Sequence, residues 1–141
     1  MEPRSADPIT AAVEVLGDRW TLLVLRDVIF ADRRYFRALL TGSPEGIASN
    51  ILADRLKRLL DAGLLTRGTA ARGQRARFDL TEAGIRTLPI LCALGDWGHD
   101  FRPGDAGEQE PIAGPARIEE LMADLRVRHL GAEPFGGAGA G

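Results

Sequence analysis

The chain has 141 residues, of which 45% are hydrophobic and 27% charged, as in an ordinary globular domain that folds around one core. No apolar run approaches the roughly 18 residues of a membrane-spanning helix, and the first residues lack the basic and apolar regions of a signal peptide. The single cysteine, Cys92, excludes an internal disulfide and a cysteine zinc cluster. We therefore expect a cytoplasmic protein with no membrane partner, no metal and no cofactor.

The net charge of −2 hides an uneven distribution. From Arg19 to Arg77 there are twelve Lys and Arg against five Asp and Glu, a net of +7, and the flanking segments are acidic. A basic block between acidic flanks favours a polyanion as the partner of the middle segment. The alternative is a solvated arginine-rich surface.

Three helices are predicted at the start of the chain. The first covers residues 8–16, with Pro8 in its first turn and Gly17 after its end. Asp18 is expected to cap a second helix over residues 19–31, which is apolar on nearly all sides and therefore central to the core. Asp32 is expected to cap a third helix over residues 33–41.

A further helix follows the glycine- and proline-containing break at residues 42–46. Leu52, Leu56 and Leu59 recur at spacings of three and four, and Gly63 ends the helix. The strand-like segments 64–70 and 75–81 are separated by a short turn, and the second alternates apolar and polar residues. The two segments therefore predict a β-hairpin.

The last part of the chain reads as two helices and a tail. Thr81 is expected to cap a long helix over residues 82–101, kinked by Pro89. Residues 102–115 read as a linker, and an apolar stripe predicts a helix over residues 116–130. The glycine-rich end cannot bury a core. We divide the chain into a domain at residues 1–102 and an extension at residues 103–141.

Helix, turn, helix and a two-stranded ribbon is the order of a winged helix-turn-helix, so the predicted class is mainly α with a small hairpin and a long C-terminal dimerisation helix. In such folds the second helix of the pair lies in the major groove of DNA. Ser49 and Asn50 can reach base edges there, and an Asn amide can pair with adenine. Other residues are expected to contact DNA through cationic or amide groups: Arg33, Arg34, Arg55, Lys57, Arg58, Arg72, Gln74, Arg75 and Arg77.

Five segments in order resemble the HxlR-type family of bacterial transcription regulators, within the wider MarR-like group. They are LGDRWTLLVLRD, RRYFRALL, GIASNILADRLKRLLDAGLL, FDLTEAGIRTLPIL and WG. The resemblance implies a homodimer that binds double-stranded, pseudo-palindromic operator DNA, and we expect it to act as a repressor. No nucleophile–base signature, glycine-rich phosphate loop or metal-ligand spacing suggests an enzyme.

Two positions depart from the family pattern. Many thiol-sensing members have a cysteine before the early proline, where this chain has Asp7, so that redox switch is missing. The recognition helix often starts with a serine, where this chain has Ala48, so its first turn is either capped by Ser49 or less firmly held.

Apolar residues left over on the first and the long helix predict the dimer contacts Ile9, Val13, Leu91, Leu94, Trp97 and Phe101. A small-molecule effector near Trp20 and Trp97 is the expected signal, if there is one, and packing is the alternative role of both rings. The alternative for the whole chain is a winged helix that binds another regulator and antagonises it.

Overall fold

The computed structural model describes residues 7–70, 75–102, 104 and 114–131. It divides into two compact units, an N-terminal unit at residues 1–79 and a C-terminal unit at residues 80–141. The predicted class, mainly helical with an antiparallel two-stranded hairpin, is confirmed. The break between the units falls within the second strand of the hairpin, whereas the sequence pattern divides the chain after residue 102.

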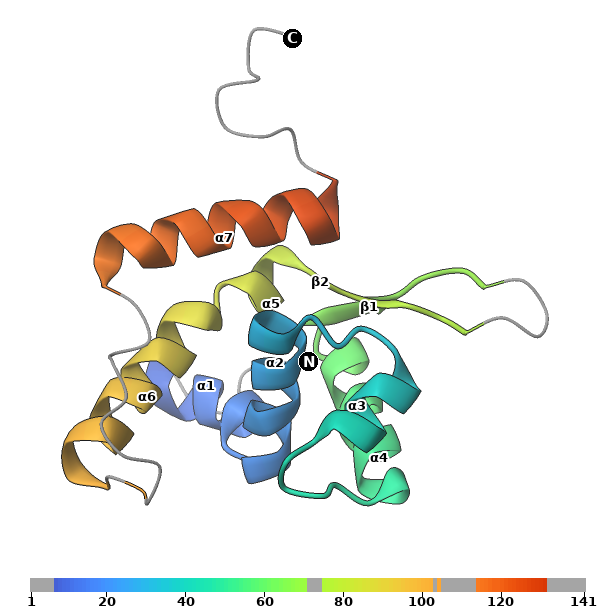
Figure 1. Ribbon diagram of the computed structural model, residues 1–141, viewed down its shortest axis with the longest axis horizontal. Coiled ribbons are helices and arrows are strands. Elements are labelled where there is room, and N and C mark those ends of the chain that lie inside the picture. Colours follow the sequence, from blue (N-terminus) through green and yellow to red (C-terminus); the bar gives the residue numbers. More distant parts are fainter. Residues whose placement is uncertain (1–6, 71–74, 103, 105–113, 132–141) are drawn as a thin grey trace, which may run out of the picture. The chain divides into compact units, whose positions relative to one another are not determined.

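The N-terminal unit contains four helices and most of the hairpin (Figure 1). The helices are α1 (Pro8–Leu16), α2 (Arg19–Ala31), α3 (Phe36–Gly42) and α4 (Ser49–Asp61). The strands are β1 (Leu65–Arg67) and β2 (Phe78–Leu80), whose last residue opens the C-terminal unit.

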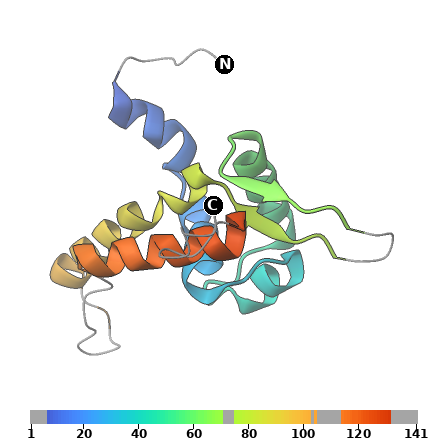
Figure 2. The same cartoon turned by 90° about the horizontal axis from the view of Figure 1, so that it is seen from above.

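Side-chain caps begin the first two helices: the cap at Asp18 was predicted, and the cap at Asp7 was not. Asp7 accepts a hydrogen bond from the Ile9 N–H at 3.1 Å and caps α1, which buries none of its residues and extends away from α2–α4 in Figure 2. Asp18 accepts from the Thr21 N–H at 2.9 Å and from the Thr21 hydroxyl at 3.0 Å. A capping carboxylate of this kind satisfies backbone donors that have no partner within the helix.

The core of the N-terminal unit lies among α2, α3 and α4. Its fully buried residues include Leu25 and Val28 of α2, Leu39 of α3, and Leu52 and Leu59 of α4. Apolar side chains at helical spacing from three helices therefore meet at one place, and the polar face of α4 is directed outward.

The prediction that Asp32 caps α3 is wrong. Asp32 has a left-handed backbone with φ 52° and ends α2, and α3 begins only at Phe36, with Tyr35 at its N-cap position and no side-chain cap. Asp tolerates this conformation better than most residues, because its short polar side chain can bond locally. Residues 33–35 form a connection between the two helices instead of the first turn of α3.

The C-terminal unit contains α5 (Glu82–Ile85), α6 (Leu88–Phe101) and α7 (Pro115–Leu130). Thr81 caps α5 as predicted, because its hydroxyl accepts from the Gly84 N–H at 3.2 Å. The predicted continuous, kinked helix is wrong: the chain turns at Arg86 and Thr87, and Pro89 lies in the first turn of a separate helix. Proline has no N–H to donate to the preceding turn, so a new helix start accommodates it at lower cost than a kink.

The helix α7 runs along α5 and α6 (Figure 2). It buries Met122 and Leu125, and its Arg126 pairs with both oxygens of Glu82 at 2.9 and 2.8 Å. The buried His129 accepts a hydrogen bond through Nδ1 from the Leu80 N–H at 2.9 Å. The structure therefore has a docked helix where a helix at 116–130 is predicted, and the predicted glycine-rich tail lies outside the described residues.

Candidate nucleic-acid interface

The helix α4 separates a buried leucine seam from a polar outer face. Leu52, Leu56 and Leu59 are at most 3% exposed and hold the helix on the core. The exposed residues of the helix share the opposite face: Ser49, Asn50, Ala53, Asp54, Lys57, Arg58 and Asp61. Small and amide side chains thus occupy the first turns of α4, and cations occupy its last two turns. Residues four positions apart lie on the same side of a helix, so these side chains are directed to one face.

The first turn of α4 has no side-chain cap. Ala48 is the N-cap residue, with an extended backbone, and Ser49 is the first residue of the helix. Of the two alternatives for this turn, capping by Ser49 is therefore wrong, and the uncapped turn is what the structure contains. Backbone N–H groups at a helix start carry a partial positive charge and are favourable partners for a phosphate oxygen.

Two ion pairs on α4 lie at the surface. Lys57 contacts Asp61 at 2.7 Å and Arg58 contacts Asp54 at 2.9 Å, and all four side chains are between 47% and 74% exposed. Exposed pairs of this kind contribute roughly 0–1 kcal/mol, since water screens them. Both cations can therefore exchange a carboxylate for a phosphate at little cost.

Arg55 has different surroundings from its neighbours. Its Nε and Nη2 donate to the two oxygens of Asp18 at 2.8 and 3.1 Å, and its side chain is only 14% exposed. The guanidinium of Arg55 holds the pKa of the Asp18 carboxyl well below its ordinary value. Because Asp18 also caps α2, this pair ties α4 to the start of α2, and we assign Arg55 a positioning role instead of the predicted DNA contact.

Arg34 is also engaged within the protein. Its side chain is 11% exposed and pairs with Asp79, and its backbone oxygen accepts from the Phe78 N–H at 2.7 Å. The connection before α3 is thereby joined to β2. The predicted phosphate clamp at the start of α3 is revised for Arg34, because the helix starts later and the guanidinium holds the hairpin in place.

Arg33 is closer to the surface but is also occupied. Its Nη1 lies 3.5 Å from the buried carboxylate of Asp27, which Arg26 also contacts at 2.8 Å. The side chain crosses so close to Gly42 that a Cβ there would lie 2.3 Å from its Nε. We therefore leave Arg33 outside the candidate DNA surface.

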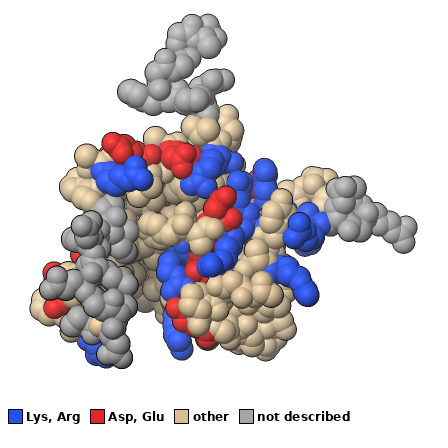
Figure 3. Space-filling model, viewed as in Figure 1, with Lys and Arg blue, Asp and Glu red and all other residues tan. Residues whose placement is uncertain are grey.

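The hairpin carries cations beside α4. Arg75 and Arg77 are exposed, and the Arg75 guanidinium lies 4.7 Å from the centre of the Tyr35 ring. Arg77 Nε pairs with Asp79 at 2.9 Å while half of its side chain stays exposed. In Figure 3 basic side chains stand out from the hairpin close to its outer loop. The predicted contacts Arg72 and Gln74 lie outside the described residues.

Two further cations were not among the predicted contacts. Arg67 on β1 and Arg37 on α3 are both exposed and line the same hollow as Lys57. A pattern of buried and exposed residues does not predict that either side chain is exposed, because β1 buries only its first residue and α3 has a single buried position. The excess of basic residues between Arg19 and Arg77 is the one sequence signal that includes them.

The comparison with known protein families agrees with this geometry. The model of the HxlR-like helix-turn-helix matches residues 15–106. The chain belongs to this family. It is thus a transcriptional regulator with a helix-turn-helix DNA-binding fold, from a family of regulators and not of enzymes.

Two bacterial proteins that are similar to this chain are described as HTH-type transcriptional regulators. An uncharacterized HTH-type transcriptional regulator of Mycobacterium tuberculosis is 32% identical over 128 residues, which is 90% of this chain and 79% of that protein. Another, from Synechocystis, is 30% identical over 108 residues, covering 76% of this chain and 78% of that protein.

Solved structures resemble the chain over most of its length. The crystal structure of PA1607 has a TM-score of 0.68 and 28% identity, covering 79% of this chain and 77% of that one. The reduced form of the transcriptional regulator YodB from B. subtilis has a TM-score of 0.58 and 26% identity, covering 72% of this chain and all of that one.

The apolar surface of this HxlR-like regulator differs from the predicted dimer contacts at one residue. Ile9 and Val13 of α1 are 73% and 57% exposed. Leu94, Trp97 and Phe101 of α6 are also exposed, at 49%, 60% and 65%. The rings of Trp97 and Phe101 lie 5.4 Å apart.

The exception is Leu91, which is 8% exposed and lies with Leu88 and Cys92 on the buried side of α6. Its place is taken by Ile90, which is 42% exposed and begins an outward stripe at spacings of four, three and four. Leu91 follows Leu88 by three residues, so the helical repeat puts it on the core side.

The other sequence-based sites are placed as follows. Trp20 is half-buried, and the Arg19 guanidinium lies 4.7 Å from its ring. Trp20 belongs to the N-terminal unit and Trp97 to the C-terminal unit. An effector pocket that both rings share therefore stays a prediction. Among the described residues no cluster of three or more His, Cys, Asp or Glu could hold a metal ion. No described helix has both the length and the apolar character needed to cross a membrane.

Proposed function

We propose that this HxlR-like regulator binds a pseudo-palindromic operator as a homodimer and represses the promoter that contains it. The observation that carries the proposal is the outer face of α4, on which Ser49, Asn50, Ala53, Lys57 and Arg58 are exposed while the leucines opposite them are buried. A helix held in this way can enter the major groove with its first turns against the bases.

Base and phosphate contacts divide along α4. Ser49 and Asn50 lie in the first turn, and the Asn50 amide can donate to and accept from one adenine. Ala53 comes one turn later and leaves room for a base edge. Lys57 and Arg58 lie nearer the end of the helix, where they can exchange their surface carboxylates for DNA phosphates.

The hairpin extends the contact to the neighbouring backbone. Arg75 and Arg77 are exposed cations on this wing, and a cation adds affinity that is independent of base sequence. Arg34 and Arg55 support the interface indirectly, because they fix β2 and α4 through Asp79 and Asp18.

The apolar stripe of α6 supports the proposed dimer. Ile90, Leu94, Trp97 and Phe101 are all at least 42% exposed, and a stripe of four large side chains on one helix is costly to leave in water. A second copy of α6 covers it with two-fold symmetry, and the exposed Ile9 and Val13 of α1 add to the interface. The two recognition helices then read half-sites about 34 Å apart, one turn of DNA.

Titration of duplexes from the region upstream of its own gene, followed by fluorescence anisotropy at several salt concentrations, tests this function. Affinity is expected to fall steeply with salt, and Asn50→Ala is expected to cost roughly 1–3 kcal/mol at one base pair and to relax the preference there. Arg86→Gln is the matched control, because Arg86 is exposed, lies in the C-terminal unit and is not among the proposed contacts.

Repression is tested separately in cells. Deletion of the gene is expected to raise expression from a reporter that carries the operator, and the Asn50→Ala variant is expected to restore repression only weakly. A chain that binds no duplex, or binds without salt dependence, would instead support the alternative of a winged helix that binds another regulator.

A further inference from the structure

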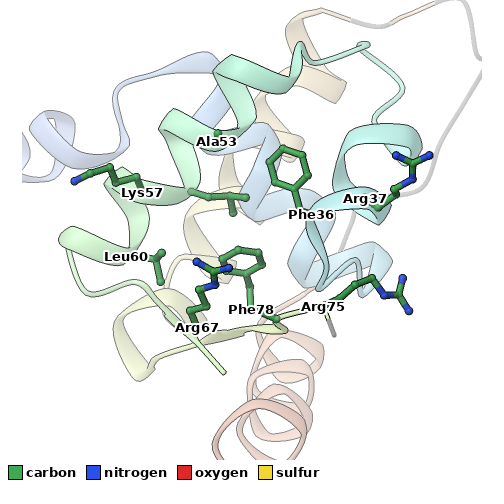
Figure 4. A pocket seen from close by; sticks show the side chains of 10 residues that line it. Phe36, Arg37, Ala53, Lys57, Leu60, Arg67, Arg75 and Phe78 are labelled. Carbon is green, nitrogen blue, oxygen red and sulfur yellow. The ribbon is translucent and has the colours of Figure 1, made fainter. Parts of the chain in front are cut away.

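The connection between α3 and α4, residues 43–48, sets how the recognition helix meets the helix before it. The two helices pack against each other, and Phe36 of α3 and Ala53 of α4 line one hollow (Figure 4). A backbone hydrogen bond of 3.1 Å from the Gly46 N–H to the Ser43 oxygen closes a turn in the connection, and Gly46 has a left-handed backbone with φ 70°. Since α4 has no side-chain cap, its start depends on what holds this connection.

Glu45, in the middle of the connection, is held by a residue of another helix. The Arg26 guanidinium, on α2, donates to both Glu45 oxygens, from Nη1 at 2.8 Å and from Nη2 at 2.6 Å. The side chains of Arg26 and Glu45 are 32% and 25% exposed, so water screens this pair less than a fully exposed one. Arg26 also holds the pKa of the Glu45 carboxyl below its ordinary value. Two parallel bonds between planar groups fix orientation as well as distance, and they tie the connection to α2.

A buried carboxylate holds Arg26 itself in place. Asp27 is 4% exposed, accepts a hydrogen bond from Arg26 Nε at 2.9 Å and lies 3.5 Å from Arg33 Nη1. A carboxylate in the interior requires cationic partners, so Asp27 keeps both guanidinium groups beside it. Arg33 crosses Gly42, the last residue of α3, where a Cβ would lie 2.3 Å from the Arg33 Nε. The two arginines therefore support the connection at two points, Gly42 just before it and Glu45 within it.

We propose that Arg26 and Glu45 position the recognition helix for its operator, through the connection that precedes this helix. The proposal rests on the DNA-binding function proposed above, and neither residue belongs to the DNA-contact surface. The sign of one charge change separates this role from a purely electrostatic one. A carboxylate near DNA repels phosphates, so neutralising it tightens binding if repulsion is its only effect. If Glu45 positions α4, neutralising it weakens binding to the operator and does not weaken binding to other sequences.

Anisotropy titrations of the full chain test this role, with a duplex from the region upstream of its own gene and a scrambled duplex of the same composition. Glu45→Gln keeps the size of the side chain and leaves the contact between Arg26 and Asp27 intact. Its Kd for the upstream duplex is expected to rise about tenfold, because a bidentate charged pair becomes a weaker neutral contact, and its Kd for the scrambled duplex to stay the same or fall. Glu120→Gln is the matched control, since it removes the same charge from an exposed pair with Arg117, and it is expected to leave the ratio of the two Kd values unchanged. A Kd for the upstream duplex that stays the same or falls in Glu45→Gln, or an equal rise for both duplexes, would overturn the proposal.

A second variant tests whether the two residues act as a pair. Arg26→Met is expected to raise the Kd for the upstream duplex at least as much as Glu45→Gln. Adding Glu45→Gln to Arg26→Met is expected to raise it no further, because a residue whose partner is already lost has no pair to break. Effects that multiply in the variant with both substitutions would mean that the residues act independently, against the proposal.

Hydrogen exchange in the free protein tests the positioning without DNA. The Leu52 N–H donates to the Ala48 oxygen at 2.9 Å at the start of α4. Its exchange is expected to be about threefold faster or more in Glu45→Gln and unchanged in Glu120→Gln, because the start of the helix opens more often when the connection is released. Unchanged exchange in Glu45→Gln would overturn the positioning role. A wild-type chain that does not prefer the upstream duplex would overturn the proposed function instead, and exchange would still decide whether Glu45 holds α4.

Discussion

The ion pair between Arg55 and Asp18 gives the sharpest test of how the recognition helix is held. Arg55→Met removes two charge-assisted hydrogen bonds to Asp18, of 2.8 and 3.1 Å, between side chains that are 14% and 29% exposed. It also removes a third, of 2.8 Å, to the more exposed Asp54. Hydrogen bonds to charged groups contribute about 1.5–3 kcal/mol each when buried. Both side chains are partly exposed, and the Asp18 carboxylate keeps its bonds to the N–H and hydroxyl of Thr21. We therefore expect a total loss of about 2 kcal/mol, which is less than the sum for two fully buried bonds.

Thermal melting of the variant measures this loss. A decrease of about 2 kcal/mol in the free energy of unfolding lowers the Tm of a chain of this size by roughly 6–8 °C. Lys57→Met and Arg58→Met are matched controls, because each also removes one cation from α4 but breaks only an exposed pair. Both pairs are i,i+4 pairs, which contribute about 0.3–0.5 kcal/mol, so the Tm of these variants is expected to fall by no more than about 2 °C.

In DNA binding we expect the larger effect from Lys57→Met and the smaller effect from Arg55→Met, the reverse of their effects on Tm. The slope of log K against log salt should fall in magnitude by about 1.8 in Lys57→Met, because one phosphate contact is lost in each subunit of the proposed dimer. It should stay unchanged in Arg55→Met under conditions where the variant is folded. If Arg55→Met melts like the wild type and loses that slope, Arg55 contacts phosphate and the positioning role is wrong.

The pH dependence gives a further check on the same pair. Arg55 lowers the pKa of Asp18 in the folded state, so the pair stabilises the fold fully above the unfolded pKa, at about pH 4, and this contribution is lost as the pH falls through the lowered pKa. The Tm difference between the wild type and Arg55→Met is therefore expected to be constant from pH 5 to 8 and to shrink below about pH 4.

Three other predictions concern the C-terminal unit. Leu94→Asp and Trp97→Ala are expected to give monomers at micromolar concentration in sedimentation, because they break the exposed stripe of α6; a wild-type dimer in both variants would exclude that helix from the interface. Mild peroxide is expected to leave operator affinity unchanged, because burial raises the pKa of the Cys92 thiol and disfavours its reactive thiolate; a loss of affinity that Cys92→Ser prevents would contradict this. His129→Leu leaves the Leu80 N–H without its acceptor and is expected to cost about 1–3 kcal/mol, which an unchanged Tm would refute.

Much of the fold could be predicted from local patterns. Asp18 and Thr81 precede apolar helical repeats and cap them as expected, and Gly63 follows α4 with the φ of +80° that glycine adopts most easily. The leucine spacing of α4 identified its buried side. These features depend on residues that are close in the sequence, and local propensity therefore determines them.

Other features depend on contacts that no local pattern contains. Asp32 precedes a plausible helix and yet ends the one before it, because residues 33–35 join β2, more than forty positions later. Arg34 and Arg55 resemble free cations in the sequence, and only the fold brings Asp79 and Asp18 to them. Ile90 replaces Leu91 on the outer stripe because the core of the C-terminal unit takes the side of α6 that carries Leu88, Leu91 and Cys92.

The missing cap of α4 has a consequence for the energetics of DNA binding. Ala48 offers no side-chain oxygen to the first N–H groups of the helix, so Ser49 and Asn50 are held less firmly than in a capped turn. A side-chain cap contributes about 1 kcal/mol. Their amide hydrogens are expected to exchange rapidly in the free protein and slowly in the complex, where a phosphate oxygen takes the place of the cap. In the proposed complex this turn becomes ordered on the operator itself, and we expect part of the intrinsic affinity to be consumed in that ordering.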